Sequence, residues 1–404
     1  MIIHCEHIVL EREIIDGYLT VEDGKITDIV KKSVEEKPCD IDFGSNTIIA
    51  GIFDTHNHGY MGFNPSNTEA LGKDEVIGYV KALASAGVTE IFPTVTLKKY
   101  DNGRSNYGDI VEAYETQSEG ARIMGIHSEG PYLNRVGEKG VDRGHPDIDI
   151  NFLQEMIHES KGILKLVAIA PELPGSKEAI RFLVKNNSRV AYAHSNDNYE
   201  EAMEAFENGI SVVTHTANVM SGIHHRNMGG LGAALLNDTV YNEMICDGLH
   251  VRNEMMEIML RVKKDYANMF MMISDNVQMA GFPVGKYHGP FGETYITEEG
   301  FSLTDTGRLA GSTKPVLYGM RNLVKNMGYS LVTVSRMASL NPNRVYGFAD
   351  RKGSLTIGKD ADFVVIDDDF KCLYTYREGK KIYDHKIDTS LIDEAHFNYY
   401  KVNE

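Results

Sequence analysis

Two histidines separated by one residue follow an apolar run near the N-terminus of the chain. The segment D-T-H-N-H-G extends from Asp54 to Gly59, directly after the run of residues 47–53. At the end of a β-strand, the imidazoles of His56 and His58 point to the same side and can bind one metal ion together. An H-x-H pair arises readily by chance in a chain with 15 histidines. The pair therefore supports a metal site only if further ligands are present elsewhere in the chain.

Further side chains that bind metals or move protons stand at the ends of other β-rich runs. They are Glu129, His194, His215, His250 and Asp275. In a parallel barrel the C-terminal ends of all strands share one mouth, so residues far apart in sequence converge there. Imidazole and carboxylate ligands suit zinc or iron, with one position left open for a water that loses a proton near neutral pH. The pattern predicts a site for one or two divalent metal ions.

Each of these residues alone also has a structural interpretation. A histidine such as His194 is more often a hydrogen-bonded residue of a core or rim than a ligand, Glu129 could form a salt bridge at the rim, and Asp275 could cap a turn. Glu172, which ends the fourth run, is as readily structural as functional. The joint occurrence of such residues at several strand ends favours the metal site.

Eight short runs rich in apolar and β-branched residues supply the strands that must position these groups. They recur at intervals of about 31 residues, near the length of one unit of an eight-stranded α/β barrel. The runs span residues 47–54, 88–95, 122–129, 164–172, 189–195, 210–216, 243–250 and 269–275. Helical patterns lie between most of them, as at 74–86, 177–187 and 198–208. This alternation predicts an α/β fold with a (β/α)8 TIM-type barrel.

The two ends of the chain follow a different pattern. Residues 17–30 predict a β-hairpin with its turn at Asp23-Gly24. Residues 353–384 predict strands, with turns at Gly358-Lys359 and Glu378-Gly379. Neither end is long enough to form a stable sheet alone, so we expect the two ends to pair with each other as a small β-sandwich.

These assignments divide the chain into two domains. Residues 1–50 and 350–404 form the predicted β-sandwich, and residues 51–349 form the predicted metal-dependent barrel. A β-rich excursion is expected at residues 286–308, after the eighth strand.

Composition narrows the classes of partner. The chain has 404 residues, 41 Lys and Arg against 58 Asp and Glu, and a net charge of −17. Such an acidic surface argues against nucleic acid or an anionic membrane as partner, and an anionic small substrate would need a local basic pocket. The four cysteines form no C-x-x-C pair, and no apolar run reaches the length of a membrane span. We expect a cytoplasmic protein with reduced thiols.

Nearly the whole chain resembles the amidohydrolase superfamily and, within it, the N-acetylglucosamine-6-phosphate deacetylase family. Nine motifs carry the resemblance, and the C-terminal segment G-S-L-T-I-G-K-D-A-D-F-V-V is similar to the superfamily's sandwich. The nine are D-x-H-x-H-G at Asp54 to Gly59, G-I-H-x-E-G-P at Gly125 to Pro131, A-P-E at Ala170 to Glu172, H-S at His194-Ser195, T-H-x-x-N-x-M at Thr214 to Met220, H-H-R at His224 to Arg226, D-G-x-H at Asp247 to His250, S-D at Ser274-Asp275 and L-A-G-S at Leu309 to Ser312.

The resemblance implies a role for each of the strand-end residues. Glu129, His194 and His215 would hold the main metal ion, and His56 with His58 would hold a second one. Members of the superfamily often bridge two metals with a carboxylated lysine, but Lys165 of the fourth run stands at the wrong end, which leaves Glu129 as the candidate bridge. Asp275, also a metal ligand, would move the proton between water and amine. His250 would stabilise the acetamide oxygen as it gains charge.

The resemblance also implies a substrate and an assembly. Asn218 and the adjacent backbone of Val219 would hold the sugar phosphate together with His225 and Arg226, whose guanidinium suits a pair of phosphate oxygens. Leu309 would line the substrate pocket. The family tends toward homodimers, so the resemblance implies that His225 and Arg226 would serve the pocket of the neighbouring subunit.

The chain departs from the family pattern mainly at positions that face the substrate. Ser128 replaces a leucine, Val219 replaces an alanine, and Asn227 and Met228 follow Arg226 in place of Glu and Pro. The metal-binding and proton-transfer residues are kept. N-Acetylglucosamine 6-phosphate is therefore the first substrate to consider, and its galactosamine epimer, another acylated sugar or a cyclic amide remain open. A barrel that binds metal without catalysis is the third possibility, against which the intact Asp275 argues.

Overall fold

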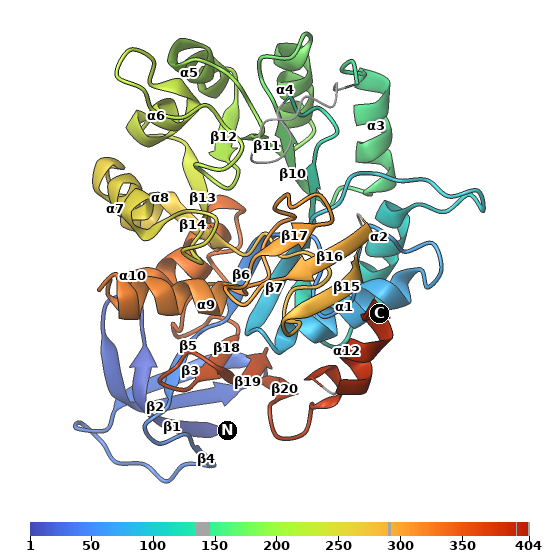
Figure 1. Ribbon diagram of the computed structural model, residues 1–404. Coiled ribbons are helices and arrows are strands. Elements are labelled where there is room, and N and C mark those ends of the chain that lie inside the picture. Colours follow the sequence, from blue (N-terminus) through green and yellow to red (C-terminus); the bar gives the residue numbers. More distant parts are fainter. Residues whose placement is uncertain (135–145, 290–291, 393, 403–404) are drawn as a thin grey trace.

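Parallel strands and surrounding helices make up most of the molecule. The computed structural model describes residues 1–134, 146–289, 292–392 and 394–402. The fold is mixed α/β, with a curled parallel sheet at its centre and a second sheet built from both chain ends below it in Figure 1. Within the described ranges, no helix has both the length and the apolar character that a membrane crossing requires. All four cysteines are free thiols.

The curled sheet places its strands side by side in chain order. Its order is β14-β13-β12-β11-β10-β9, and β6, β7 and β8 form a separate parallel sheet. Isolated parallel bridges connect Thr94 with His127 and Asn57 with Asn276. The strand bounds are β6 Ile52–Asn57, β7 Val88–Pro93, β8 Arg122–Ile123, β9 Ile126–Glu129, β10 Leu164–Ile169, β11 Arg189–Tyr192, β12 Ile210–Val213, β13 Tyr241–Ile245 and β14 Phe270–Ile273.

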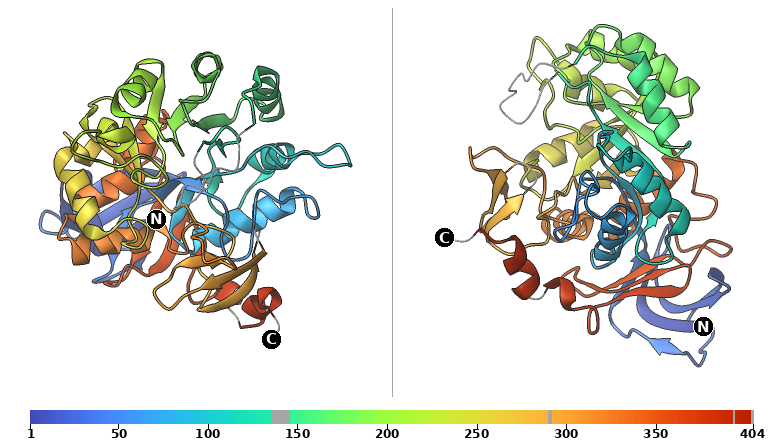
Figure 2. Two further views of the ribbon diagram at one scale, coloured as in Figure 1. Left: turned by 45° about the horizontal axis from the view of Figure 1, so that its top comes forward. Right: turned by 90° about the vertical axis from the view of Figure 1, so that its right-hand side faces the viewer.

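The helices lie outside these strands, as Figures 1 and 2 show. The three helices predicted from the sequence are present as α1, α4 and α5. The helix α5 begins with a capping box, in which Asn198 and Glu201 bond each other's backbone N–H. The bounds are α1 Lys73–Ala84, α2 Asn106–Thr116, α3 Ile150–Glu159, α4 Ser176–Lys185, α5 Tyr199–Glu207, α6 Gly229–Leu236, α7 Asn253–Val262, α8 Tyr266–Met269, α9 Val316–Arg321, η1 Asn322–Asn326, α10 Leu331–Ser335, η2 Arg336–Leu340 and α11 Asn341–Val345.

Two predicted strands are each divided in the structure. The first predicted run separates into β5 (Thr47–Ala50), which joins the terminal sheet, and β6, which pairs with β7. The break falls at Gly51, where a Cβ atom would lie 2.1 Å from Thr89 Oγ1, so only glycine allows β7 to approach here. The third run separates into β8 and β9.

The two chain ends pair with each other in one sheet. The terminal sheet has the order β20-β19-β18-β5-β1-β2-β3, with β4 beside β1. The predicted turns are confirmed at Asp23-Gly24 and Glu378-Gly379, where both residues of each turn have positive φ. The remaining bounds are β1 Ile2–Val9, β2 Ile14–Glu22, β3 Lys25–Lys31, β4 Ile41–Asp42, β18 Phe363–Ile366, β19 Cys372–Arg377 and β20 Lys380–Asp384.

The predicted β-rich excursion is confirmed as a three-stranded antiparallel sheet after β14. Its strands are β15 Gly285–Gly289, β16 Gly292–Ile296 and β17 Ser302–Thr304. The C-terminal segment, with η3 (Ser390–Ile392) and α12 (Glu394–Tyr400), leaves the terminal sheet and lies against this excursion (Figures 1 and 2). A bridge between Tyr287 and Lys401 fixes the two segments together.

Candidate metal centre and active site

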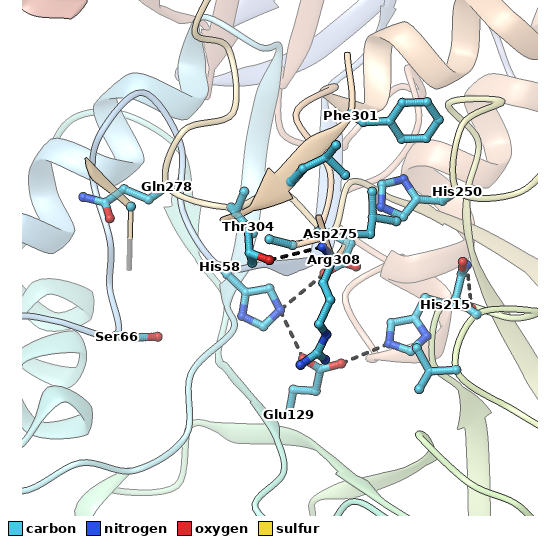
Figure 3. A pocket seen from close by; sticks show the side chains of 18 of the residues that line it. His58, Ser66, Glu129, His215, His250, Asp275, Gln278, Phe301, Thr304 and Arg308 are labelled. Atoms are coloured by element: carbon cyan, nitrogen blue, oxygen red, sulfur yellow. Dashed lines mark hydrogen bonds and ion pairs between the residues drawn. The ribbon is translucent and has the colours of Figure 1, made fainter. Parts of the chain in front are cut away.

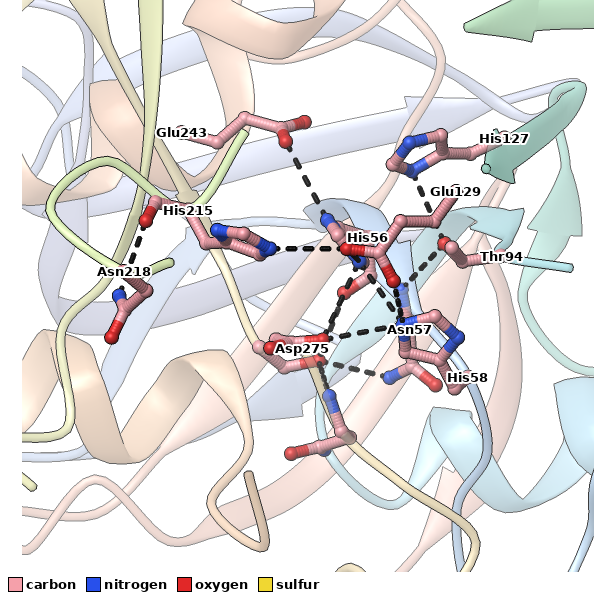
Figure 4. A network of polar contacts seen from close by, with 12 residues as sticks. His56, Asn57, His58, Thr94, His127, Glu129, His215, Asn218, Glu243 and Asp275 are labelled. Carbon is pink, nitrogen blue, oxygen red and sulfur yellow. Dashed lines mark hydrogen bonds and ion pairs between the residues drawn. The ribbon is translucent and has the colours of Figure 1, made fainter. Parts of the chain in front are cut away.

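The structure brings the predicted metal ligands together in two groups (Figure 4). In each group, one nitrogen or oxygen atom per residue lies within 4.8 Å of the others. The groups are His56, His58 and Asp275, and Glu129, His194 and His215. In the first, His56 Nε2 lies 3.1 Å from His58 Nε2 and 3.4 Å from Asp275 Oδ1. In the second, His194 Nε2 lies 3.1 Å from His215 Nε2.

Glu129 links the two groups through its two carboxylate oxygens. Its Oε1 lies 2.9 Å from His194 Nε2 and 3.0 Å from His215 Nε2. Its Oε2 lies 3.2 Å from His58 Nε2. The six residues therefore form one cluster, which we call the mouth cluster: His56, His58, Glu129, His194, His215 and Asp275.

Buried polar contacts fix the end of β6 from which His56 and His58 project. The Asp54 carboxylate is fully buried and accepts hydrogen bonds from Ser274 Oγ at 2.5 Å and from Asn57 Nδ2 at 3.1 Å. The Asn57 side chain also accepts from Tyr79 Oη and from the Gly59 N–H. Asp54 therefore positions the two imidazoles by joining the ends of β6 and β14, although it contacts none of the ligand atoms.

Three of the six cluster residues lie beyond their strands, in an uncommon backbone conformation. The sequence analysis extends the strands to these residues, but β11, β12 and β14 end two residues earlier. His194, His215 and Asp275 have φ of 48°, 29° and 51°, in the left-handed region that L-residues rarely occupy. Such strain concentrates at functional sites, where the surrounding structure holds it in place. Here His194 and His215 contact Glu129, and Asp275 contacts His56 and His58.

The buried charges of the cluster act strongly on one another. Burial alone would lower the pKa of His58, but hydrogen bonds to Asp275 and Glu129 outweigh burial and raise this pKa to about 9. Burial alone would raise the pKa of Asp275, but the charge of His56 and contacts with His58 lower it to about 2. The cluster thus favours ionised carboxylates and attracts positive charge.

The donor set fits a divalent ion. Two pairs of Nε2 atoms face each other at 3.1 Å, so their lone pairs converge on a point that a cation can occupy. In the described part of the chain, the ion pairs of Glu129 and Asp275 are all with imidazoles, with no lysine or arginine among them. Imidazole with carboxylate is the ligand chemistry of zinc and non-haem iron.

His250 is held beside the cluster with one nitrogen toward the pocket. Its Nδ1 lies 2.7 Å from Asp247 Oδ2, and Asp247 also accepts the His250 backbone N–H. Burial would lower the pKa of His250, but the Asp247 hydrogen bond outweighs burial and raises it. His250 Nε2 is buried without a hydrogen-bond partner in the described structure, in a residue that lines the pocket. A protonated His250 can therefore donate from Nε2 to a substrate oxygen.

A pocket of about 1740 Å³ opens above the cluster (Figure 3). The predicted substrate residues Asn218, Val219 and Leu309 line it. His225 and Arg226 are exposed and are not among its lining residues. A single chain therefore does not bring these two residues to the pocket.

Several residues of the site carry no signal in the sequence beyond their residue type. Arg308, from the segment after β17, projects into the pocket between His58 and His215 in the view of Figure 3, and Lys98 and Arg252 also line the pocket. In the sequence, only their positive charge could have suggested that these three residues line the pocket. Glu172 accepts from Ser195 Oγ and from backbone, which agrees with its structural interpretation.

Two buried residues beside His56 were also missed. The His127 ring lies edge-on to His56 with centroids 4.5 Å apart, and burial lowers the pKa of His127 well below its usual value. Glu243, on β13, lies on the other side of His56 (Figure 4). Both are buried polar residues inside strands, in the sequences I-H-S-E of β9 and Y-N-E-M-I of β13, and this polar character is the signal that could have indicated them.

Comparison with known proteins agrees with this geometry. The model of the amidohydrolase family matches residues 47–399. The N-acetylglucosamine-6-phosphate deacetylase of Vibrio furnissii is 30% identical over 376 residues, which are 91% of this chain and 91% of that protein. The N-acetylgalactosamine-6-phosphate deacetylase of Escherichia coli O157:H7 is 31% identical over 369 residues, which are 89% of this chain and 95% of that protein.

Solved structures lead to the same family. A mutant N-acetyl-D-glucosamine-6-phosphate deacetylase from Mycobacterium smegmatis, in complex with N-acetyl-D-glucosamine-6-phosphate, has a TM-score of 0.84 at 25% identity, over 95% of this chain and 99% of that chain. The Thermotoga maritima N-acetylglucosamine-6-phosphate deacetylase has a TM-score of 0.76 at 27% identity, over 95% of this chain and 100% of that chain. The chain therefore belongs to the amidohydrolase family and, within it, groups with the N-acetylglucosamine-6-phosphate deacetylases.

Proposed function

We propose that this enzyme removes the acetyl group from an N-acetylated amino-sugar phosphate. The first candidate substrate is N-acetylglucosamine 6-phosphate, which would give glucosamine 6-phosphate and acetate. One observation carries the proposal: Glu129 contacts both ligand groups at the floor of a pocket that Asp275 and His250 also line. Metal-assisted hydrolysis of an amide bond uses a metal site, a proton-transfer group and a donor to the carbonyl oxygen together.

The mouth cluster would hold one or two divalent ions, with zinc or iron as the best fit. Glu129, His194 and His215 would bind one, and His56 and His58 with Asp275 would bind the other. When bound, such an ion lowers the pKa of a water ligand and polarises a carbonyl group. Glu129 would be shared between the two groups.

Asp275 would transfer the proton. Its contacts with His56 and His58 lower its pKa and favour the ionised form, so it can take a proton from the water that attacks the amide carbon. The same proton then goes to the amine nitrogen as the C–N bond breaks. This relay leaves Asp275 ionised again at the end of the cycle.

His250 would stabilise the amide oxygen as it gains negative charge. Asp247 fixes the imidazole through Nδ1 and favours its protonated form, which leaves Nε2–H to donate into the pocket. The acetyl end of the substrate would then lie between His250 and the mouth cluster, with Leu309 nearby.

The sugar phosphate would lie toward Asn218 and Val219. His225 and Arg226 are exposed in the single chain, so we propose that they complete the phosphate site of a neighbouring subunit in a homodimer. The cations of the same chain, Lys98, Arg252 and Arg308, line the pocket and would offset the net charge of −17 locally.

We also propose the complete architecture and setting. Residues 51–349 would form a closed (β/α)8 barrel, and residues 1–50 with 350–404 would form a small β-sandwich domain. The TM-score of 0.84 to a deacetylase of the same family supports this arrangement. The free thiols and the small-molecule substrate support a cytoplasmic enzyme, without nucleic acid or membrane as partner.

The deciding experiment measures acetate release from a panel of N-acetylated sugar phosphates and their unphosphorylated forms, with bound metal quantified in the same sample. We expect kcat/KM for a phosphorylated substrate to exceed that of its unphosphorylated form by about 10²-fold, because a paired charge in the site is lost without the phosphate. The similarity to a galactosamine-type deacetylase makes that epimer the second member to test. Metal-loaded protein that releases no acetate from any member would refute the proposal.

A pair of variants tests the shared phosphate site. Arg226→Gln is expected to raise KM for the phosphorylated substrate and to leave the unphosphorylated one unchanged. Lys161→Gln, at a surface residue in the turn before β10 and outside the pocket lining, is the matched control. Sedimentation that shows only monomer at working concentration would remove the neighbouring-subunit assignment.

A further inference from the structure

A buried carboxylate on β13 faces the side of His56 that is turned away from the mouth cluster. The Glu243 side chain is fully buried. Thr55 Oγ1 donates a hydrogen bond of 2.8 Å to Glu243 Oε1 and so holds the carboxylate in place. The other oxygen, Oε2, lies 3.6 Å from His56 Nδ1 (Figure 4). This leaves Oε2 directed at the imidazole.

The two nitrogens of His56 have different surroundings. Nε2 faces His58, Asp275 and Glu129, so it is the nitrogen available to a metal ion. Nδ1 is buried without a hydrogen-bond partner in the described structure, as is Glu243 Oε2. These two unsatisfied atoms are 3.6 Å apart and face each other.

The chemistry of imidazole connects these two sides. A histidine that gives its Nε2 lone pair to a metal must carry its proton on Nδ1, and a buried N–H without an acceptor is unfavourable. A carboxylate behind the ring fixes the tautomer and the ring orientation, and it raises the basicity of the ligand nitrogen. The His127 ring packs edge-on against His56, but its Nδ1 already faces Thr55 O at 3.2 Å.

We propose that Glu243 is a positioning residue that accepts a hydrogen bond from the Nδ1–H of His56 and thereby prepares Nε2 to bind metal. The inference rests on the metal centre proposed above. In this arrangement Thr55 would hold Glu243, Glu243 would hold His56, and His56 would bind the metal. These contacts run between β6 and β13. The described contacts of the Glu243 side chain are with Thr55 and His56, so its effect falls first on the ion that His56 binds.

A purely structural role explains Glu243 less well. A buried carboxylate is costly unless charge or several hydrogen bonds compensate it. Glu90, another buried glutamate of the strands, has Lys352 at 3.6 Å and the Asn343 amide at 2.8 Å. Glu243 has one hydroxyl and the His56 imidazole. The metal-bound imidazole N–H would supply the missing partner.

The experiment measures the dissociation constant of each Zn²⁺ ion by chelator competition in wild type, Glu243→Gln and Glu243→Met. Glutamine keeps the shape and Thr55 contact but loses the charge, and methionine removes the acceptor altogether. We expect the ion bound by His56 to weaken by about 10-fold or more in both variants. The ion bound by Glu129, His194 and His215 is expected to change less than about 2-fold, because Glu243 supports none of its ligands. Glu90→Gln is the control with an equal change at a buried glutamate away from the cluster.

Each outcome decides the assignment. Thermal unfolding first establishes that the variants are folded. Wild-type dissociation constants in folded Glu243→Gln and Glu243→Met would overturn the inference while leaving the metal centre intact. Equal weakening of both ions would also overturn it, because the effect would then be general rather than through His56. A wild-type protein that binds no Zn²⁺ would refute the proposed centre and the inference together.

Discussion

Two buried ionic clusters occupy different parts of the molecule. Only one of them contains a lysine, whose ammonium group neutralises part of the negative charge. The mouth cluster combines Glu129 and Asp275 with four imidazoles. The second, which we call the Lys352 cluster, lies near the start of β7 and consists of Glu90, Lys352, Asp360 and Asp362. Both bury several carboxylates, so burial of acidic groups does not by itself distinguish a site from a structural element.

Lys352 neutralises the second cluster from within. Its Nζ forms a hydrogen bond with Asp362 and lies 3.3 Å from Asp360 and 3.6 Å from Glu90. Arg351 and Lys25 each add a contact of 2.9 Å to Asp360. These residues come from the parallel strand β7, the C-terminal part of the chain and the β2–β3 hairpin, so the cluster joins the terminal sheet to the parallel strands.

The presence or absence of a lysine indicates the role of each cluster. Carboxylates that already contact a lysine need no further cation, so the Lys352 cluster stabilises the fold. The carboxylates of the mouth cluster pair only with imidazoles in the described structure, and imidazoles can exchange protons for a metal ion. Further positive charge in direct contact with these carboxylates must therefore come from protons or from an ion, and the pocket above gives access to either.

Removal of metal should give the largest effect. A chelator is expected to reduce acetate release to background, because no side chain of the mouth cluster replaces the ion's action on water and carbonyl. It should also lower the melting temperature, since an ion present at 100 times its dissociation constant stabilises the fold by about 2.7 kcal/mol. Activity assays and calorimetry before and after re-addition of Zn²⁺ measure both effects. Full activity in metal-free protein would contradict the assignment of the mouth cluster as a metal site.

The exchange Asp275→Asn tests the chemistry of the mouth cluster. The amide cannot carry the proton, so hydrolysis should fall by about 10²–10⁴-fold while metal is retained. Asp360→Asn makes the same chemical change in the Lys352 cluster and should lower stability with kcat unchanged. Steady-state kinetics with metal analysis of both variants measures the contrast. Unchanged hydrolysis in Asp275→Asn would show that the proton moves by another group.

Removing the internal cation tests the Lys352 cluster. Lys352→Met leaves Glu90 and Asp362 without their buried partner, which should cost about 3–5 kcal/mol of unfolding free energy. Metal content and kcat per folded molecule should stay at wild-type values. Lys25→Met removes a half-exposed partner of Asp360 and should cost about 1 kcal/mol or less. Urea unfolding of both variants gives the two values, and equal losses would mean that burial does not set the difference.

Much of the mouth cluster was predictable because its chemistry repeats along the chain. Metal-binding residue types follow one apolar run after another, and the ends of parallel strands meet at one edge. The backbone that aims them was not predictable, since His194, His215 and Asp275 adopt positive φ without being glycine. The break between β5 and β6 was marked only by Gly51, within a run that otherwise continues as one strand.

The Lys352 cluster was not predicted at all. Glu90 lies within a predicted strand, and its partners Lys352 and Asp362 are more than 250 residues away in sequence. A local sequence pattern cannot indicate a contact between residues so far apart in the chain. The residues of the mouth cluster, in contrast, are all of metal-binding types and can be recognised from the sequence. His225 and Arg226 were singled out from the sequence, but they do not line the pocket of a single chain. Their predicted role in the pocket therefore requires a second copy of the chain.

The last prediction concerns the pH dependence of stability that Glu90 contributes. Burial raises the pKa of Glu90 to about 8 from the ordinary value of 4.5, although Lys352 opposes this. Between these values the folded chain holds one proton more than the unfolded chain. The resulting stabilisation is complete below pH 4.5 and is lost as the pH rises through 8.

Glu90→Gln cannot titrate, so it should remove this slope. Relative to the variant, wild type should lose up to about 1.4 kcal/mol of unfolding free energy for each pH unit between 5 and 8. Urea unfolding at four pH values in this range, with each protein saturated with Zn²⁺, measures the difference. Parallel curves would mean that Lys352 keeps Glu90 ionised throughout. In that case the second cluster would already be fully charged at pH 5, and the contrast with the mouth cluster would rest on the identity of the cation alone.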